Sequence, residues 1–137
     1  MKIKQYFIAI VDDDEDDRDI LAATFRENYD NASVKTFQSG DELLDVLKSG
    51  ATLPNLIITD LYMPIFSGVD LILIMKKDLR IAHIPVVLLS TIKNEKAIQE
   101  ISVLEDVFYF VKPNNLIDYS LMADEIINKL LPAIRKG

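Results

Sequence analysis

The stretch "FIAIVDDDEDDRDI", residues 7–20, joins five apolar residues directly to a dense cluster of acids. Seven of the eight residues from 12 to 19 are aspartate or glutamate, and like charges this close disfavour the ionised form of each neighbour. The apolar run is typical of a buried strand over residues 6–11. The apolar spacing after the acids is typical of a helix over residues 16–28. The stretch therefore predicts a strand and a helix with an acidic junction between them.

The same alternation of short apolar strands and amphipathic helices continues along the chain. Strands that are apolar throughout, each followed by a helix, predict an α/β fold in which helices cover both faces of one five-stranded parallel sheet. The predicted strands cover residues 6–11, 33–37, 55–60, 85–90 and 107–111. The predicted helices cover residues 16–28, the segment between Ser39 and Gly50, and residues 69–77, 94–103 and 117–134.

Length and composition limit the classes of function. The chain has 137 residues, which suits a single domain over residues 1–137, and a net charge of -7, which disfavours binding to nucleic-acid phosphates. It has no cysteine, which excludes disulfides, thiol chemistry and thiolate metal sites. No apolar run approaches the roughly 18 residues of a membrane-spanning helix, and the N-terminus has too few apolar residues for a secretion signal. We therefore expect a cytoplasmic protein that binds neither nucleic acid nor a membrane.

Polar side chains collect where the predicted strands end. Asp12 and Asp13 follow the first strand, Asp60 ends the third, Ser90 ends the fourth and Lys112 follows the fifth. Because the carboxyl ends of parallel strands meet at one edge of the sheet, we expect these side chains to lie close together. Three carboxylates suit Mg²⁺, a lysine and a hydroxyl suit a phosphoryl group, and a carboxylate can itself attack phosphorus to form an acyl phosphate. The sequence therefore predicts a magnesium-dependent phosphoryl site.

In this order and spacing the motifs resemble a response-regulator receiver domain of two-component systems, of the single-domain chemotaxis-regulator type. They are "VDD" (11–13), "DLYMPIFSGVDL" (60–71), "PVVLLST" (85–91) and "YFVKP" (109–113). The resemblance implies a flavodoxin-like, doubly wound (βα)5 fold with strand order 2-1-3-4-5. It also implies a stand-alone phosphoacceptor without an output domain. Such a protein is not an ordinary enzyme, although it assists its own phosphorylation and dephosphorylation.

The resemblance further implies a role for each site residue. Asp60 would accept the phosphoryl group, and Lys112 would pair with the phosphoryl oxygens. Asp13 would bind Mg²⁺ directly and Asp12 largely through water, with Asp60 and the main-chain carbonyl of Tyr62 as further metal ligands. The phosphoryl donor would be a sensor histidine kinase or a histidine phosphotransfer protein.

A second set of residues would carry the signal. Ser90 would be the switch hydroxyl that moves toward the phosphoryl group, and Tyr109 would swing inward to fill the space that Ser90 leaves, although aromatic residues in strands are often plain core residues. The signal would appear on the face formed by the fourth helix, fifth strand and fifth helix, where a downstream protein target would bind. The Lys112–Pro113 bond would be cis.

Some positions depart from the usual family pattern or call for a plain structural interpretation. Tyr62 and Ile92 are bulky and uncharged next to the site, which predicts slow self-dephosphorylation. Asp106 stands where the family usually has glycine, so the exit from the fourth helix is expected to differ in shape. Gly68 is interpreted as a turn residue and the only histidine, His83, as a surface residue. The remaining acids of the first stretch are interpreted as helix-start and surface charges: Asp14, Glu15, Asp16, Asp17 and Asp19.

The same residues do not fit two other classes of metal-dependent protein. An EF-hand loop starting at Asp12 would need glycine and glutamate where Asp17 and Ala23 stand, and a phosphatase of the haloacid-dehalogenase type would need a small hydroxyl or valine that the acidic run lacks. Two alternatives stay open. One is a phosphorelay intermediate that passes the phosphoryl group to a histidine phosphotransfer protein. The other is a receiver that binds its partner constitutively without using Asp60.

Overall fold

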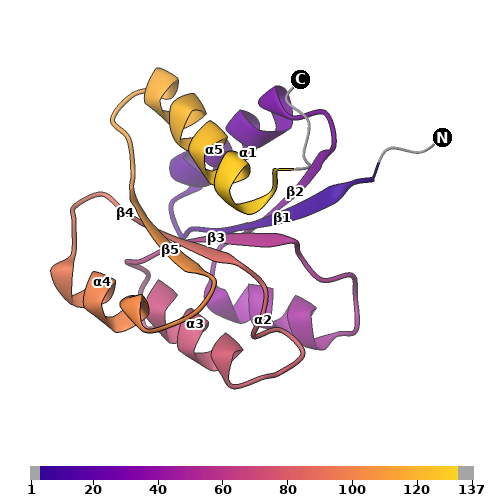
Figure 1. Cartoon of the computed structure of the whole chain (residues 1–137), viewed down its shortest axis with the longest axis vertical. Helices are drawn as coiled ribbons and strands as arrows, with labels where there is room; N and C mark the ends of the chain where they lie inside the picture. The colour runs from indigo at the N-terminus through magenta and orange to yellow at the C-terminus, as the bar shows by residue number, and fades with distance from the viewer. Residues whose placement is uncertain (1–3, 133–137) are drawn as a thin grey trace.

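Five strands and five helices alternate along residues 4–132, which are the residues that the computed structural model describes (Figure 1). The strands are β1 (Tyr6–Val11), β2 (Ala32–Phe37), β3 (Leu56–Asp60), β4 (Val86–Ser90) and β5 (Val107–Val111). The helices are α1 (Glu15–Asn28), α2 (Gly40–Lys48), α3 (Gly68–Lys76), α4 (Glu95–Ser102) and α5 (Leu116–Leu130). All neighbouring strands pair in parallel in the order β2-β1-β3-β4-β5, which confirms the predicted flavodoxin-like, doubly wound sheet.

The sheet separates two hydrophobic clusters. Helices α1 and α5 cover one face, where Phe25 and Ile126 are buried, and α2, α3 and α4 cover the other, where Leu47, Leu71 and Met75 are buried (Figure 1). Every residue of β3 and β4 is buried, as expected for central strands with helices on both faces. Polar side chains on these two strands can therefore approach solvent only at the strand ends.

Side-chain caps fix where the helices begin. Asp14 before α1, Ser39 before α2 and Asn115 before α5 each accept a hydrogen bond from a backbone N–H three residues further on. Helix α5 ends at Leu130, short of the predicted end, because the backbone leaves the helical region at the next residue. The predicted positions 133–134 lie outside the described residues. Within residues 4–132 no helix has both the length and the apolar character needed to cross a membrane.

Two expectations about the backbone are wrong. No cis peptide bond occurs among the described residues, so the bond between Lys112 and Pro113 is trans. Gly68 does not have the positive φ of a turn glycine; it is the first residue of α3. A Cβ on Gly68 would lie 2.4 Å from the backbone oxygen of Asp60, so glycine is required there for close approach.

Candidate functional site

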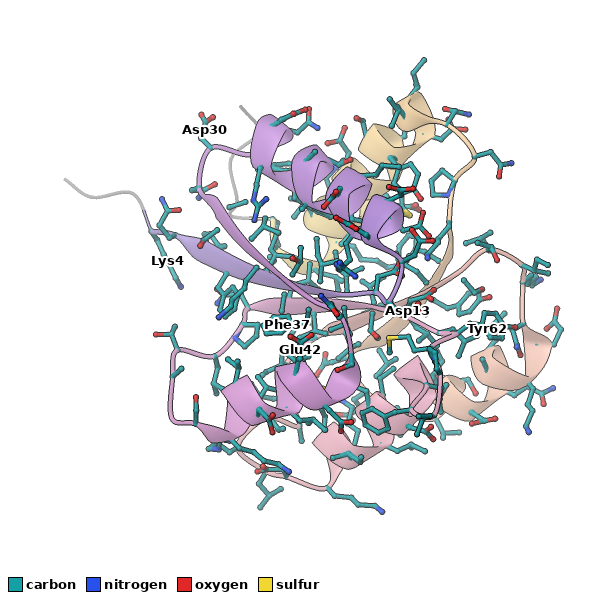
Figure 2. The ribbon with its side chains drawn as sticks, turned by 180° about the vertical axis from the view of Figure 1, so that it is seen from behind. Lys4, Asp13, Asp30, Phe37, Glu42 and Tyr62 are labelled. Atoms are coloured by element: carbon teal, nitrogen blue, oxygen red, sulfur yellow. The ribbon has the colours of Figure 1, made fainter. Side chains whose placement is uncertain are left out.

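The predicted site residues lie at one edge of the sheet because their strands are neighbours and parallel. Asp12 directly follows β1, Asp60 is the last residue of β3, Ser90 is the last residue of β4, and Lys112 directly follows β5. Figure 2 shows Asp13 and Tyr62 at this edge and Lys4 at the opposite end of the strands.

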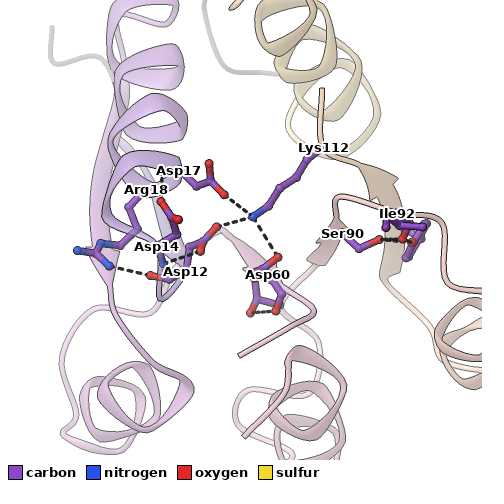
Figure 3. A network of polar contacts seen from close by, with 10 residues as sticks. Asp12, Asp14, Asp17, Arg18, Asp60, Ser90, Ile92 and Lys112 are labelled. Atoms are coloured by element: carbon purple, nitrogen blue, oxygen red, sulfur yellow. Dashed lines mark hydrogen bonds and ion pairs between the residues drawn. The ribbon is translucent and has the colours of Figure 1, made fainter. Parts of the chain in front are cut away.

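Lys112 is the centre of the site. Its Nζ lies 2.8 Å from Asp12 Oδ2, 2.9 Å from Asp17 Oδ2 and 3.1 Å from Asp60 Oδ1 (Figure 3). The lysine is 7 % exposed, so these ion pairs form largely out of water. Burial by itself would lower the pKa of Lys112, but the hydrogen bonds with Asp12 and Asp17 outweigh burial and raise the pKa. The ammonium group therefore stays charged at neutral pH.

Three carboxylates form a compact oxygen cluster beside this lysine. Asp12, Asp13 and Asp60 each offer an oxygen within 4.8 Å of the others. Burial, followed by the nearby charge of Asp12, raises the pKa of Asp60 to about 6, although Lys112 acts in the opposite direction. Burial likewise raises the pKa of Asp12. Because hard oxygen ligands and uncompensated negative charge suit a divalent cation, the residues present fit Mg²⁺.

The start of α1 holds the acidic junction in place. The backbone N–H of Asp14 donates to Asp12 Oδ1 at 2.9 Å, and Asp14 Oδ1 accepts from the N–H of Asp17 at 3.0 Å as the helix cap. Arg18 Nη1 donates to the backbone oxygen of Asp12 at 2.9 Å. These contacts give Asp12 a fixed orientation and place a cation next to the acidic run, which lowers its internal repulsion.

Asp17 is the site residue that sequence reasoning missed, since it was interpreted as a surface charge. Its side chain is 31 % exposed and pairs with Lys112 from the first turn of α1. A signal for this position was present, because Asp17 precedes the buried Leu21 by four residues and so lies on the same helix face. The face of α1 that packs on the sheet therefore begins with an acid.

Ser90 is buried at the end of β4, but its hydroxyl is turned away from Asp60 (Figure 3). Ser90 Oγ donates to the backbone oxygen of Ile92 at 2.7 Å and also hydrogen-bonds with the hydroxyl of Tyr109. The Tyr109 hydroxyl accepts a further hydrogen bond from the N–H of Asn94 at 2.9 Å. The serine and the tyrosine that were predicted to form the switch are thus in direct contact with each other.

A known protein family matches most of the length of this chain. The family described as "Response regulator receiver domain" matches residues 8–122 of the chain. The chain belongs to the response-regulator receiver family. This confirms the family that the sequence motifs predicted.

Relatives of this receiver domain occur in plants and bacteria. The two-component response regulator ORR3 of Oryza sativa subsp. indica is 30 % identical over 122 residues, which cover 89 % of this chain and 91 % of ORR3. The phosphorylated cyanobacterial phytochrome response regulator RcpA has a similar structure, with a TM-score of 0.85, 26 % identity and coverage of 97 % of this chain and 99 % of RcpA. The Mn²⁺-bound form of response regulator Rcp1 shares the fold, with a TM-score of 0.81, 23 % identity and coverage of 96 % and 99 %.

The receiver domain thus brings most of the predicted site together. Asp12, Asp13, Asp60 and Lys112 form one cluster, whereas the hydroxyl of Ser90 points out of that cluster. The main-chain carbonyl of Tyr62 as a metal ligand stays a prediction. His83 is exposed, as interpreted from the sequence.

Proposed function

We propose that this receiver domain accepts a phosphoryl group from a phosphorylated histidine on Asp60, with Mg²⁺ as cofactor. The observation that carries the proposal is the position of Lys112 Nζ, 3.1 Å from Asp60 Oδ1 and 2.8 Å from Asp12 Oδ2. The lysine places its charge directly beside the acceptor carboxylate, where phosphoryl oxygens would arrive. The surrounding acids still exceed the one lysine, and a divalent cation would offset this excess.

The transfer step requires little beyond positioning and charge neutralisation. An oxygen of Asp60 bonds to phosphorus while the bond from phosphorus to the histidine nitrogen breaks, and the imidazole leaves with that electron pair and takes up a proton from solvent. Lys112 holds its ammonium group against the phosphoryl oxygens throughout. Mg²⁺, held by Asp12, Asp13, Asp60 and the main-chain carbonyl of Tyr62, would supply the remaining positive charge.

The signal is proposed to pass through the contact between Ser90 and Tyr109. To reach a phosphoryl group on Asp60, the Ser90 hydroxyl has to leave the backbone oxygen of Ile92 and the hydroxyl of Tyr109. Tyr109 can then move into the vacated space, which changes the face formed by α4, β5 and α5. A sensor histidine kinase or a histidine phosphotransfer protein is the proposed donor, and a downstream protein target would bind the altered face. Action as a single domain without an output domain stays a prediction, as does a cytoplasmic location.

The test is phosphorylation by acetyl phosphate with Mg²⁺, followed by intact mass. We expect one added phosphoryl group on the wild-type protein, and none on Asp60→Asn or in the presence of a chelator. Asp30→Asn is the matched control, because Asp30 is an exposed aspartate at the far end of the molecule (Figure 2). Uptake by Asp60→Asn, or uptake that is insensitive to the chelator, would contradict the proposal.

The same phosphorylated sample separates an output switch from a relay. Rapid transfer of the phosphoryl group from Asp60 to a histidine phosphotransfer domain would favour the relay. Retention of the group, together with a changed environment of Ser90 and Tyr109, would favour the switch.

A further inference from the structure

Asn94 connects three parts of the molecule and lies outside the residues assigned to phosphoryl transfer. Its Nδ2 donates a hydrogen bond of 2.6 Å to the hydroxyl of Tyr62. Its Oδ1 accepts from the backbone N–H of Ala97 at 2.9 Å and so caps α4. Its own backbone N–H donates to the hydroxyl of Tyr109 at 2.9 Å. A single residue thus ties the loop after β3 to the start of α4 and to β5.

The cap fixes which end of the Asn94 amide faces Tyr62. A turned amide would place Nδ2 against the N–H of Ala97, donor against donor, and the helix would lose its cap. Nδ2 is therefore directed at the Tyr62 hydroxyl by the requirements of α4. We call this contact between Asn94 and Tyr62 the bridge.

The bridge joins the two loops that leave the sheet beside the phosphoacceptor. Tyr62 follows Asp60 by two residues, and Asn94 follows Ser90 by four. Asp60 and Ser90 end neighbouring strands, since Asp60 pairs with Leu89 in the sheet. Tyr62 is 54 % exposed, so burial alone does not fix its ring, and the hydroxyl contact with Asn94 is a further restraint.

We propose that the bridge is a clamp that holds the Tyr62 ring beside Asp60 and slows the loss of the phosphoryl group to water. In this loss a water oxygen bonds to phosphorus while the bond from phosphorus to Asp60 breaks. The carboxylate leaves with the electron pair, and the water protons pass to inorganic phosphate and solvent. Water has to approach opposite the breaking bond, so a fixed ring at this edge limits access. The inference rests on the proposed function, and it makes Asn94 a positioning residue that acts through Tyr62.

The test compares the decay of phosphorylated Asp60 in Tyr62→Phe, Asn94→Ser and the double variant. Tyr62→Phe keeps the ring and removes the hydroxyl; Asn94→Ser keeps a good helix cap and cannot bridge. Loss of a hydrogen bond of this kind changes a rate or equilibrium constant by roughly two- to tenfold. We therefore expect each single variant to lose the phosphoryl group faster than wild type by about this factor. Because both variants break the same contact, the double variant should be no faster than either one.

Two further measurements separate a clamp from a general structural effect. Asn115→Ser is the matched control, because Asn115 caps α5 through the same kind of contact, with the N–H of Asp118, and it should leave the decay unchanged. In the unphosphorylated protein, the NMR signals of the Asn94 side-chain amide should move in Tyr62→Phe.

The outcomes distinguish the clamp from the function on which it rests. Three results would each overturn the clamp alone. The first is decay in Tyr62→Phe at the wild-type rate, and the second is a double variant whose increase in decay rate is the product of the two single increases. The third is an absence of change in the NMR signals of the Asn94 side-chain amide. No phosphoryl uptake by the wild-type protein would overturn the proposed function and the clamp with it.

Discussion

Lys112 Nζ donates hydrogen bonds to Asp12 and Asp17 and forms an ion pair with Asp60, so three carboxylates surround one lysine. The three carboxylates carry three negative charges and the lysine carries one positive charge. The exposed Asp13 adds a further negative charge. Burial and the charge of Asp12 make Asp60 hard to ionise, which is why its pKa rises to about 6. Asp60 therefore carries an unfavourable negative charge at neutral pH, and this charge is what a divalent cation would relieve.

The raised pKa of Asp60 predicts a pH dependence of stability in metal-free protein. The folded pKa of about 6 exceeds the ordinary value of 3.8, so the folded state binds more protons than the unfolded state between these values. Wild-type stability should fall as pH rises through this window, and the full penalty should be present above it. Asp60→Asn has no such penalty, so the amount by which its free energy of unfolding exceeds that of wild type should grow from about 0.5 kcal/mol at about pH 4 to about 3 kcal/mol at about pH 7. Urea unfolding across this pH range measures the difference.

Mg²⁺ provides the control for this prediction. A cation that binds the ionised acids of the folded state stabilises that state by mass action, so excess Mg²⁺ should reduce the difference between wild type and Asp60→Asn at about pH 7. Asp30→Asn, an exposed change, should show no such pattern. An Asp60→Asn variant that is no more stable than wild type at neutral pH would show that Lys112 compensates the Asp60 charge fully.

Residue by residue, the site could be predicted where the topology alone positions a side chain. Asp12, Asp60 and Lys112 stand at the ends of parallel strands, so their convergence follows from the strand pattern. Asp17 could not be placed in this way, because its contact with Lys112 depends on which face of α1 is turned toward the sheet. The direction of the Ser90 hydroxyl was equally inaccessible, since it depends on partners that the strand pattern does not determine.

Among the elements, the junction between β3 and α3 constrains the position of Asp60. Gly68 N–H donates to the backbone oxygen of Leu61 at 3.0 Å, so the first turn of α3 lies directly against the end of β3. A Cβ on Gly68 would meet the backbone oxygen of Asp60 at 2.4 Å and Leu88 Cδ1 at 2.6 Å. The backbone cannot yield as a side chain can, so this contact is a constraint on where Asp60 lies.

We expect Gly68→Ala to lower the free energy of unfolding by about 1–3 kcal/mol, the usual cost of forcing extra atoms into a packed region. Gly40→Ala is the matched control, because the three atoms nearest to its Cβ would all belong to the ring of Phe66, and that half-buried ring can turn away. Its change should stay within about 1 kcal/mol, since alanine also favours the helix. Chemical denaturation of both variants checks the pair; equal stabilities would contradict a backbone constraint at Gly68.

The elements themselves were predictable because the central strands β1, β3 and β4 are largely buried on both faces and most helices carry a clear cap or apolar face. Strand β5 begins at Val107 in register with Val86, although Asp106 replaces the usual glycine before it. Asp106 adopts a φ of 62°, a conformation that aspartate tolerates better than most residues. The chain thus leaves α4 through an aspartate in the left-handed region. The sequence alone indicated a departure from the family pattern at this position but not this conformation.

At the scale of the whole molecule, the sheet both separates the two hydrophobic clusters and carries the site at its edge. Asp60 lies on β3, Ser90 on the adjacent β4 and Tyr109 on β5, so the path from Asp60 to the face formed by α4, β5 and α5 crosses only neighbouring strands. Asn94 adds α4 to this path through its cap and its contact with Tyr109. Helix α2, near the other edge of the sheet, packs against β1 and β2. A change at Asp60 should therefore affect α4 and β5 more strongly than α2.

This asymmetry can be measured with beryllofluoride and Mg²⁺, which together imitate a phosphoryl group on an aspartate. We expect the amide NMR signals of Ser90, Asn94 and Tyr109 to move and the changes to extend over α4 and β5, because the Ser90 hydroxyl exchanges its present partners for the bound group. The amides of α2 should move little, since no hydrogen bond recorded for the described residues connects that helix to Ser90 or Tyr109. Asp60→Asn should abolish the whole pattern. Changes confined to the loops that touch Asp60 would mean that this receiver binds the group without switching, and they would favour the relay or constitutive role over an output switch.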